Sequence, residues 1–288
     1  MAADLLFLCN AKAGGGRTTD QCGYFLRSHP DIARRSRVAD VGSSEESIKK
    51  IVRIGREKVI VAAGGDGTAN MAASALLSVG RTDIPLALLP IGTGNALAHS
   101  IGLTSTDATA QALRGGKTRK LAVVRTDHPQ KDTALISVSA GFEPSIIDSR
   151  EKWRHGERLR SMHRLSKAAV SLTAGISLAA DGVVLCAASE ALFSAGLYMC
   201  PSLAFGRRIF PERTPGAFDT WAVVYKTPLS YAKTLLTGGE YAAGIRRVQG
   251  WTSAVLDTTG MVQIDGELLP GGKVTLHHCP ATLTVVVP

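Results

Sequence analysis

The 288-residue sequence predicts an α/β fold, in which an N-terminal domain with a parallel sheet precedes a domain rich in β-strands. Three observations support this prediction. Short apolar runs alternate with helical segments up to about residue 116. Three of those runs lead into a glycine-rich loop, and after residue 116 strand-like runs dominate the chain. Alternating strands and helices are typical of a parallel sheet that is covered on both faces.

The N-terminal domain is predicted from the order of these segments along the chain. Strands are expected at residues 4–10, 36–41, 59–63 and 84–90, and helices at residues 43–54, 68–79 and from Ala96 onward. The strands are continuous apolar runs, which indicates burial on both faces. The helix 43–54 begins with Ser43 and Glu46 at the spacing of a capping box, which would satisfy backbone N–H groups at its start.

The second domain is predicted because the alternation of strands and helices stops after residue 116. Residues 118–126 and 133–142 are expected to be strands without a helix between them. A basic amphipathic helix is expected next, because apolar residues recur at every third or fourth position, namely Leu159, Met162, Leu165, Ala169, Leu172 and Ile176. Only strands and turns are expected from residue 183 to 288. The domains are therefore predicted at residues 1–117 and 118–288, with the alternative that the last residues of the chain belong to the first domain.

Composition places the chain among ordinary globular proteins. Apolar residues make up 45% of the sequence and charged residues 20%. No apolar run reaches the roughly 18 residues that a membrane-spanning helix needs, and the N-terminus lacks the basic start of a secretory signal. A soluble, cytoplasmic protein is expected. The five cysteines show no C-x-x-C spacing, so buried, reduced thiols are expected rather than disulfides or a zinc site.

The net charge of +9 is concentrated in one segment of the chain. Residues 150–167 contain seven Lys or Arg and two acids, which gives 7 − 2 = +5. Such a block attracts an anion, whether nucleic acid, an anionic membrane surface or nucleotide phosphates, although many charge runs are only solvated helix faces. Nucleic acid is disfavoured because aromatic residues are only 5% of the sequence and Trp153 alone lies within the basic run.

Three glycine-rich loops follow predicted strands, at residues 10–17 (NAKAGGGR), 64–68 (GGDGT) and 91–95 (IGTGN). Each alone is compatible with a structural turn, but three at one sheet edge favour nucleotide binding, because backbone N–H groups and helix N-termini bind phosphate. None has the P-loop pattern or G-x-G-x-x-G. Asp66 within GGDGT is unexpected beside phosphate, unless a divalent metal or a hydroxyl that must lose its proton is present there.

With the segment VQIDGELLP (Val262 to Pro270), these loops resemble the catalytic domain of the diacylglycerol kinase family, which includes bacterial diacylglycerol kinases and the sphingosine and ceramide kinases. The four motifs run from residue 10 to residue 270 and so span nearly the whole chain. The resemblance implies an α/β nucleotide domain, of a type shared with NAD kinases, followed by a β-sandwich domain. It also implies Mg²⁺-dependent transfer of the γ-phosphoryl group of ATP to a hydroxyl of a lipid alcohol.

The resemblance also implies site residues. ATP is expected at Asn10, Gly14, Gly15, Gly16, Ser43, Gly64, Gly65, Gly67, Thr68, Gly92, Thr93, Gly94, Asn95, Arg154 and Arg160. Asp66 is the expected catalytic acid or base, and Asp265 and Glu267 are its rivals for the role of base. Substrate contacts are expected from Asp66, Phe142 and Asp148. Metal contacts are expected from Asp66 through Mg-ATP and, weakly, from Asp219.

The sphingosine kinase branch is similar in further detail, and the chain also departs from it. Arg154 and Arg160 match the arginines that hold ATP phosphates in that branch. Ala13 replaces the usual Ser of the first loop, and Met71 replaces the Glu that follows GGDGT in the family. Ile147 replaces the Asp that pairs with the sphingoid amine, and Asp148 is one place away. Sphingoid specificity is therefore not implied.

The sequence thus predicts a lipid kinase. Two alternatives remain open, which are a soluble kinase resembling NAD kinase and an inactive module that binds nucleotide or lipid. The expected partners are ATP, a lipid alcohol and, peripherally, the anionic inner face of a membrane, without nucleic acid. Residues 203–213 are a candidate membrane anchor in which Phe205, Ile209 and Phe210 flank two arginines. The alternative is a loop whose aromatic residues pack on the second domain.

Overall fold

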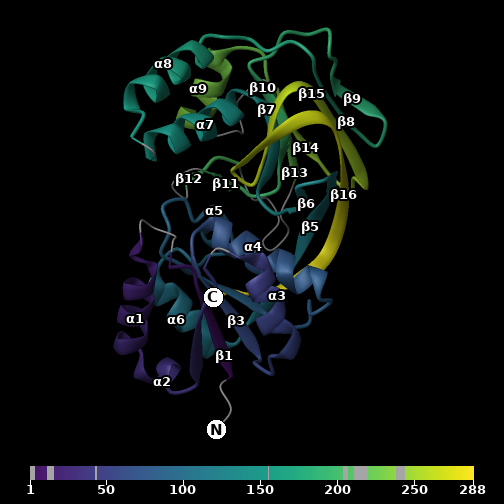
Figure 1. The fold of residues 1–288 in the computed structure, drawn as a ribbon. Helices are drawn as coiled ribbons and strands as arrows, with labels where there is room; N and C mark the ends of the chain where they lie inside the picture. Colours follow the sequence, from purple (N-terminus) through teal and green to yellow (C-terminus); the bar gives the residue numbers. More distant parts are fainter. Residues whose placement is uncertain are drawn as a thin grey trace. The chain divides into compact units, whose positions relative to one another are not determined.

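The computed structural model describes residues 4–11, 16–42, 44–154, 156–203, 207–210, 220–237 and 244–288. The chain divides into two compact units (Figure 1). The N-terminal unit consists of Met1–Val123, Ser202–Arg207 and Pro280–Pro288, and the C-terminal unit of Val124–Pro201 and Arg208–Cys279. The end of the chain therefore belongs to the N-terminal unit.

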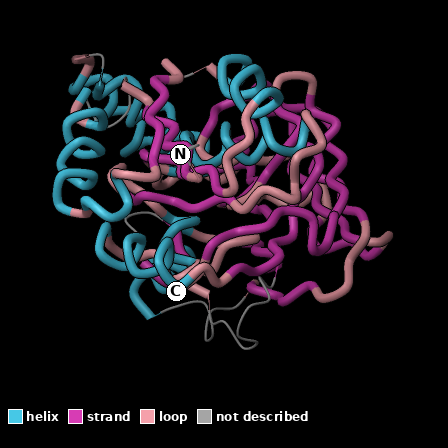
Figure 2. Tube along the Cα trace, turned by 90° about the horizontal axis from the view of Figure 1, so that it is seen from below, coloured by secondary structure: helices cyan, strands magenta, loops and turns pink. Residues whose placement is uncertain are grey.

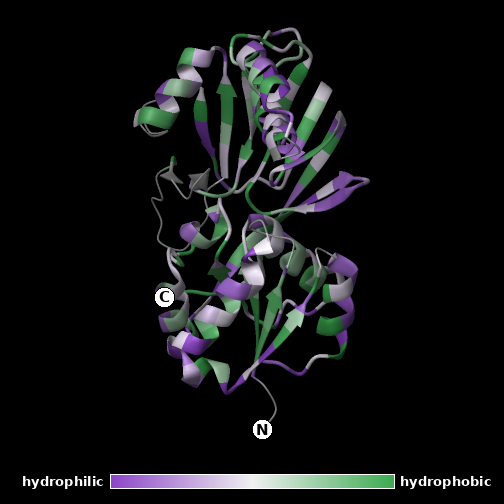
Figure 3. Ribbon diagram, turned by 60° about the vertical axis from the view of Figure 1, so that its left-hand side comes forward, coloured by the Kyte–Doolittle hydropathy of each residue, from purple (hydrophilic) through white to green (hydrophobic). Residues whose placement is uncertain are grey.

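The N-terminal unit is built on a parallel sheet. Its strands are β1 (Leu5–Cys9), β2 (Ser36–Asp40), β3 (Val59–Gly64) and β4 (Leu86–Pro90), in the order β2-β1-β3-β4. The end of β16 (Glu267–Val286) joins the sheet beside β4, where Val285 pairs in parallel with Leu86. All five residues of β1 are buried, and the central strands are coloured hydrophobic along most of their length (Figure 3). Burial on both faces explains why β1, β3 and β4 read as continuous apolar runs. The prediction that all four strands are buried was wrong for β2, which lies at the edge of the sheet beside β1 and whose Arg37, Val38 and Asp40 are exposed.

Helices lie on both sides of this sheet, with α1 and α6 on one side and α3 and α4 on the other (Figure 1). The helices are α1 (Thr18–Ser28), α2 (Pro30–Ala33), α3 (Glu45–Ile54), α4 (Asp66–Ser78), α5 (Ala96–Ser100) and α6 (Thr106–Gly115). The alternation is visible as magenta and cyan segments around the N-terminus in Figure 2. The cap of α3 is Ser44, whose hydroxyl accepts the N–H of Ser47 at 3.3 Å. The predicted cap at Ser43 was wrong by one residue, and Ser43 itself lies outside the described residues.

The C-terminal unit is rich in strands. They are β5 (Thr118–His128, which starts in the N-terminal unit), β6 (Lys131–Ala134), β7 (Ser137–Gly141), β8 (Ile176–Ala180), β9 (Val183–Cys186), β10 (Ser194–Tyr198), β13 (Thr220–Tyr225), β14 (Ile245–Val248), β15 (Ser253–Ile264) and the first part of β16. Two short strands, β11 (Ser202–Leu203) and β12 (Arg207–Arg208), pair with each other. Strands β14, β13, β10, β7, β15 and β16 are neighbours in that order, with antiparallel pairing. The predicted fold class, a parallel α/β region followed by a strand-rich region, is confirmed.

Among the described residues of the C-terminal unit, the helices are α7 (Phe142–Arg154), α8 (Arg158–Ala168) and α9 (Pro228–Thr237). Helix α9 corrects the prediction that only strands and turns follow residue 183. The predicted amphipathic helix is also shorter than its apolar pattern, because Ile176 lies in β8. Leu159 and Met162 are exposed rather than packed inward.

Two further features of the described residues bear on the predictions. None of the five cysteines forms a disulfide within the described residues, and four of them are buried. No helix in the described ranges has the length and apolar character that crossing a membrane requires.

Candidate active site

The strands that precede the glycine-rich loops end at one level of the parallel sheet. Cys9 of β1 is paired with Ala63 of β3, and Gly64 of β3 is paired with Pro90 of β4. The chain therefore leaves all three strands at the same carboxyl edge, which is where ligands bind in sheets of this type.

The second and third loops touch each other through their backbones. A Cβ atom built on Gly92 would lie 2.3 Å from the Cα of Gly65 and 2.7 Å from its nitrogen. No side chain fits at Gly92 without displacing the GGDGT loop. The third loop is also closed on itself, because the Asn95 side chain donates to the Gly92 carbonyl at 2.8 Å and accepts the Gly92 N–H at 3.1 Å.

Asp66 joins these two loops. It is the first residue of α4, and its Oδ1 accepts the backbone N–H of Leu97 in α5 at 3.1 Å. Its Oδ2 occupies the space that a side chain at residue 94 would need, since a Cβ on Gly94 would lie 2.6 Å from it. One carboxyl oxygen thus holds the loops together, while the whole side chain remains only half-buried.

The remaining predicted nucleotide residues differ in accessibility. Asn10 and Thr68 are buried, whereas Gly16, Gly67 and Thr93 are exposed. A Cβ on Gly67 would meet no atom within 4 Å, so the backbone is open there. Gly14 and Gly15 lie outside the described residues, as does the side chain of Arg154.

Asp265 occupies the turn between β15 and β16 in the C-terminal unit. Its Oδ2 accepts the N–H of Leu135 at 2.7 Å, and its Oδ1 accepts those of Ile136 at 2.7 Å and Ser137 at 3.0 Å. Burial raises the pKa of Asp265, and the three amide donors act against that rise. Both oxygens are engaged in holding the connection between β6 and β7.

The other predicted acids of the C-terminal unit form ion pairs. Glu267 lies 2.6 Å from the ammonium of Lys131, with its side chain more than half exposed. Asp148 in α7 pairs with Lys152 and, at 3.1 Å, with Arg164 of α8. Burial acts to raise the pKa of Asp148, but these two cations hold that pKa below its usual range. Asp148 therefore ties α7 to α8.

Two predicted contact residues of the C-terminal unit have local partners. The exposed Arg160 lies 3.3 Å from Glu157 at the start of the same helix. Phe142 belongs to an aromatic cluster, because its ring stacks on Phe193 at 4.5 Å and meets the edge of Tyr231 at 5.3 Å.

Glu143 is a buried carboxyl group that the sequence reasoning did not identify. It lies in the first turn of α7 and makes hydrogen bonds with the hydroxyls of Ser194 and Tyr198. Ser194 has one hydroxyl proton, which it can donate to the Ala140 carbonyl at 2.9 Å. Burial raises the pKa of Glu143, whereas the hydroxyl donors of Ser194 and Tyr198 act to lower it.

We therefore predict that Glu143→Gln stabilises the fold more at neutral pH than in acid. The folded state favours protonated Glu143, so wild-type stability falls as pH rises above 4.5, the ordinary pKa of this group, towards its raised folded value. Gln does not titrate and offers one donor and one acceptor to the same hydroxyls. Urea unfolding midpoints of both proteins between pH 4 and 8 measure the effect. A difference independent of pH would contradict a raised pKa of Glu143 in the folded state.

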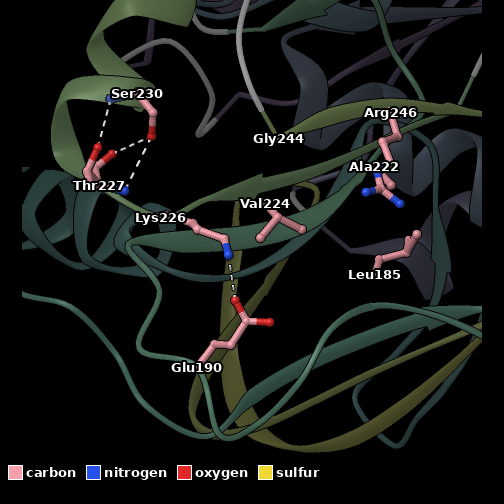
Figure 4. A pocket seen from close by; sticks show the side chains of 9 residues that line it. All are labelled: Leu185, Glu190, Ala222, Val224, Lys226, Thr227, Ser230, Gly244 and Arg246. Carbon is pink, nitrogen blue, oxygen red and sulfur yellow. Dashed lines mark hydrogen bonds and ion pairs between the residues drawn. The ribbon is translucent and has the colours of Figure 1, made fainter.

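A pocket of about 420 Å³ lies elsewhere in the C-terminal unit (Figure 4). Its apolar lining comes from Leu185, Ala222 and Val224, and Lys226 bonds to Glu190 across it at 2.9 Å. None of the residues predicted from the sequence lines this pocket.

Part of the predicted membrane anchor is corrected by the structure. Ile209 and Phe210 are buried, and Phe210 stacks on Trp221 at 5.6 Å. The expectation that these two side chains form exposed tips was wrong, because both are buried and Phe210 packs against Tyr198 and Trp221 of the C-terminal unit. Phe205 lies outside the described residues, and so does Asp219.

Comparison with known proteins gives a family match for the N-terminal region. Residues 4–126 match the family model of the diacylglycerol kinase catalytic domain. The resemblance to that family is confirmed. A protein of Enterobacter named probable lipid kinase YegS-like is 29% identical over 137 residues, which cover 47% of this chain and 45% of that protein. A relative from Klebsiella pneumoniae with the same name is 38% identical over 85 residues, or 25% of its length. The chain thus matches less than half of the length of these curated relatives.

Solved structures match over nearly the whole chain. A diacylglycerol kinase from Bacillus anthracis has a TM-score of 0.72 at 18% identity, with 99% of this chain and 97% of that chain covered. An NAD kinase from Archaeoglobus fulgidus, solved with ATP, has a TM-score of 0.54 at 13% identity, with 98% and 93% covered. At these identities the structures show a common fold.

Proposed function

We propose that the protein is an ATP-dependent lipid kinase, which transfers the γ-phosphoryl group of ATP to a hydroxyl of a lipid alcohol. The observation that carries the proposal is Asp66, which joins two glycine-rich loops at the carboxyl edge of a parallel sheet. Backbone N–H groups of these loops would bind the phosphates. The matched family and the names of the relatives support a lipid as acceptor.

In the proposed phosphoryl transfer, the protein has little covalent chemistry to perform. The acceptor oxygen forms a bond to the γ-phosphorus, the bond from that phosphorus to the β–γ bridging oxygen breaks, and ADP leaves. We assign the hydroxyl proton to the carboxylate of Asp66. Arg154 and Arg160 are proposed to neutralise the transferring phosphate.

Magnesium fits this site only together with the nucleotide. Within the described ranges, no three His, Cys, Asp or Glu residues form a group that could hold a metal ion. Mg²⁺ would therefore be held by phosphate oxygens of the nucleotide near the negative charge of Asp66, and it would neutralise charge on the phosphates. In the C-terminal unit, we propose that the aromatic cluster around Phe142 contacts the acyl part of the acceptor.

The test is to incubate the purified protein with labelled ATP, Mg²⁺ and a panel of lipid alcohols in micelles, with NAD as a parallel substrate. Phosphorylation of at least one lipid, identified by mass, is expected. Phosphorylation of NAD alone would replace the proposal with an NAD kinase-like activity. ATP binding without turnover on any member of the panel would favour an inactive binding module.

A further inference from the structure

We propose that the exposed side of α8 and the end of α7 form a docking surface for an anionic lipid bilayer. The surface consists of Trp153, Arg158, Leu159, Met162 and Lys167, and is called the α8 face below. Docking is a binding property that can be measured without ATP, so it can fail or succeed independently of the proposed kinase activity.

The first observation is the exposure of large apolar side chains on this face. Leu159 is 84% exposed, Met162 59% and Trp153 49%. Val170 and Leu172, just beyond the end of α8, are also exposed. Isolated exposed apolar residues are common, but several within one short segment indicate an interaction surface.

The second observation is that α8 presents two large apolar residues on its outward side in addition to the side that packs on the protein. Its inner side carries Ser161, Leu165 and Ala168, and the Ser161 hydroxyl bonds to the Ser149 carbonyl of α7 at 2.7 Å. Leu159 and Met162 lie three residues apart on the side away from that contact. Two of the apolar residues that would normally stabilise the helix against the protein are therefore presented outward.

The third observation is the charge around these apolar residues. The guanidinium of Arg158 lies 5.4 Å from the centre of the Trp153 ring, and α8 itself contains no acidic residue. The nearby acids Asp148 and Glu157 already pair with basic side chains. Over the part of the chain that the structure describes, neither Arg158 nor Lys167 has an ion-pair partner.

These observations together favour an anionic bilayer as the partner. An eleven-residue helix is about 16 Å long and can lie flat in the headgroup region, with Leu159 and Met162 inserted and the basic residues at the phosphates. Each basic residue near such a surface contributes about 1 kcal/mol to the free energy of binding to the bilayer. A single tryptophan offers little base stacking, which disfavours a nucleic acid.

Co-sedimentation with vesicles of phosphatidylglycerol or of phosphatidylcholine tests the proposal. We expect the wild-type protein to pellet with the anionic vesicles and not with the zwitterionic ones. The double variant Leu159→Ser, Met162→Ser should bind at least tenfold more weakly, from the loss of apolar insertion. The double variant Arg158→Ser, Lys167→Ser should bind roughly thirtyfold more weakly, from two contributions of about 1 kcal/mol each.

A matched control is available on β9, where Val183 and Val184 are 61% and 64% exposed. Val183→Ser, Val184→Ser removes similar apolar surface outside the α8 face and should bind vesicles like wild type. Circular dichroism melting of every variant checks the fold. The proposal is overturned if wild type does not pellet with phosphatidylglycerol, if it pellets equally with phosphatidylcholine, or if both α8 variants bind like the β9 control.

Discussion

Asp66→Asn is expected to lower turnover about a hundredfold or more while leaving the fold intact. An asparagine keeps an oxygen that can accept the N–H of Leu97, a bond now 3.1 Å long, so the two loops should stay joined. It removes the negative charge that would orient Mg-ATP or accept the hydroxyl proton. Initial rates with the lipid identified in the panel, together with thermal melting, measure both parts of this expectation.

Glu267→Gln is the matched control for Asp66→Asn. It removes the charge of a rival candidate base that is already paired with Lys131 at 2.6 Å. We expect it to retain most of the activity. If Asp66→Asn keeps most of its turnover and Glu267→Gln loses it, the role of base moves to Glu267.

Asp265→Asn is expected to destabilise the C-terminal unit by about 3 kcal/mol. The carboxyl group of Asp265 accepts three backbone N–H groups, from Leu135, Ile136 and Ser137. An asparagine offers one acceptor oxygen, and its amide nitrogen would face N–H donors. Leaving buried donors without an acceptor costs about 1–3 kcal/mol each. The backbone itself should tolerate the change, because asparagine readily adopts the left-handed conformation seen at φ 51.

Asp181→Asn is the matched control for this prediction. Asp181 also has a left-handed backbone, at φ 46, and accepts backbone N–H groups from Thr252 and Ser253, but it lies in an exposed turn. Asp181→Asn is expected to lose less stability than Asp265→Asn, because water can replace the missing acceptor in an exposed turn. Urea unfolding of the two variants measures the difference. Full stability of Asp265→Asn combined with lost turnover would make Asp265 the base instead.

The sequence alone predicted the elements whose cause is local. The strands β1, β3 and β4 of the N-terminal unit are apolar runs that are buried on both faces, and the glycines mark where a backbone needs close approach. Gly65 and Gly92, whose backbones touch, belong to motifs that were recognised from the sequence. The family match covers residues 4–126, which contain these motifs.

Only the tertiary structure decided the state of the acids in the C-terminal unit. Asp265 meets amides about 130 positions away in the sequence, and Glu143 meets a serine 51 positions away. Whether a carboxyl group is free, neutral or tied to a cation depends on such partners, and no local pattern records them. The same holds for α8, where periodicity predicted a buried apolar stripe and the structure leaves Leu159 and Met162 exposed. Spacing along a helix determines which residues share a side, but the neighbouring elements determine which side is covered.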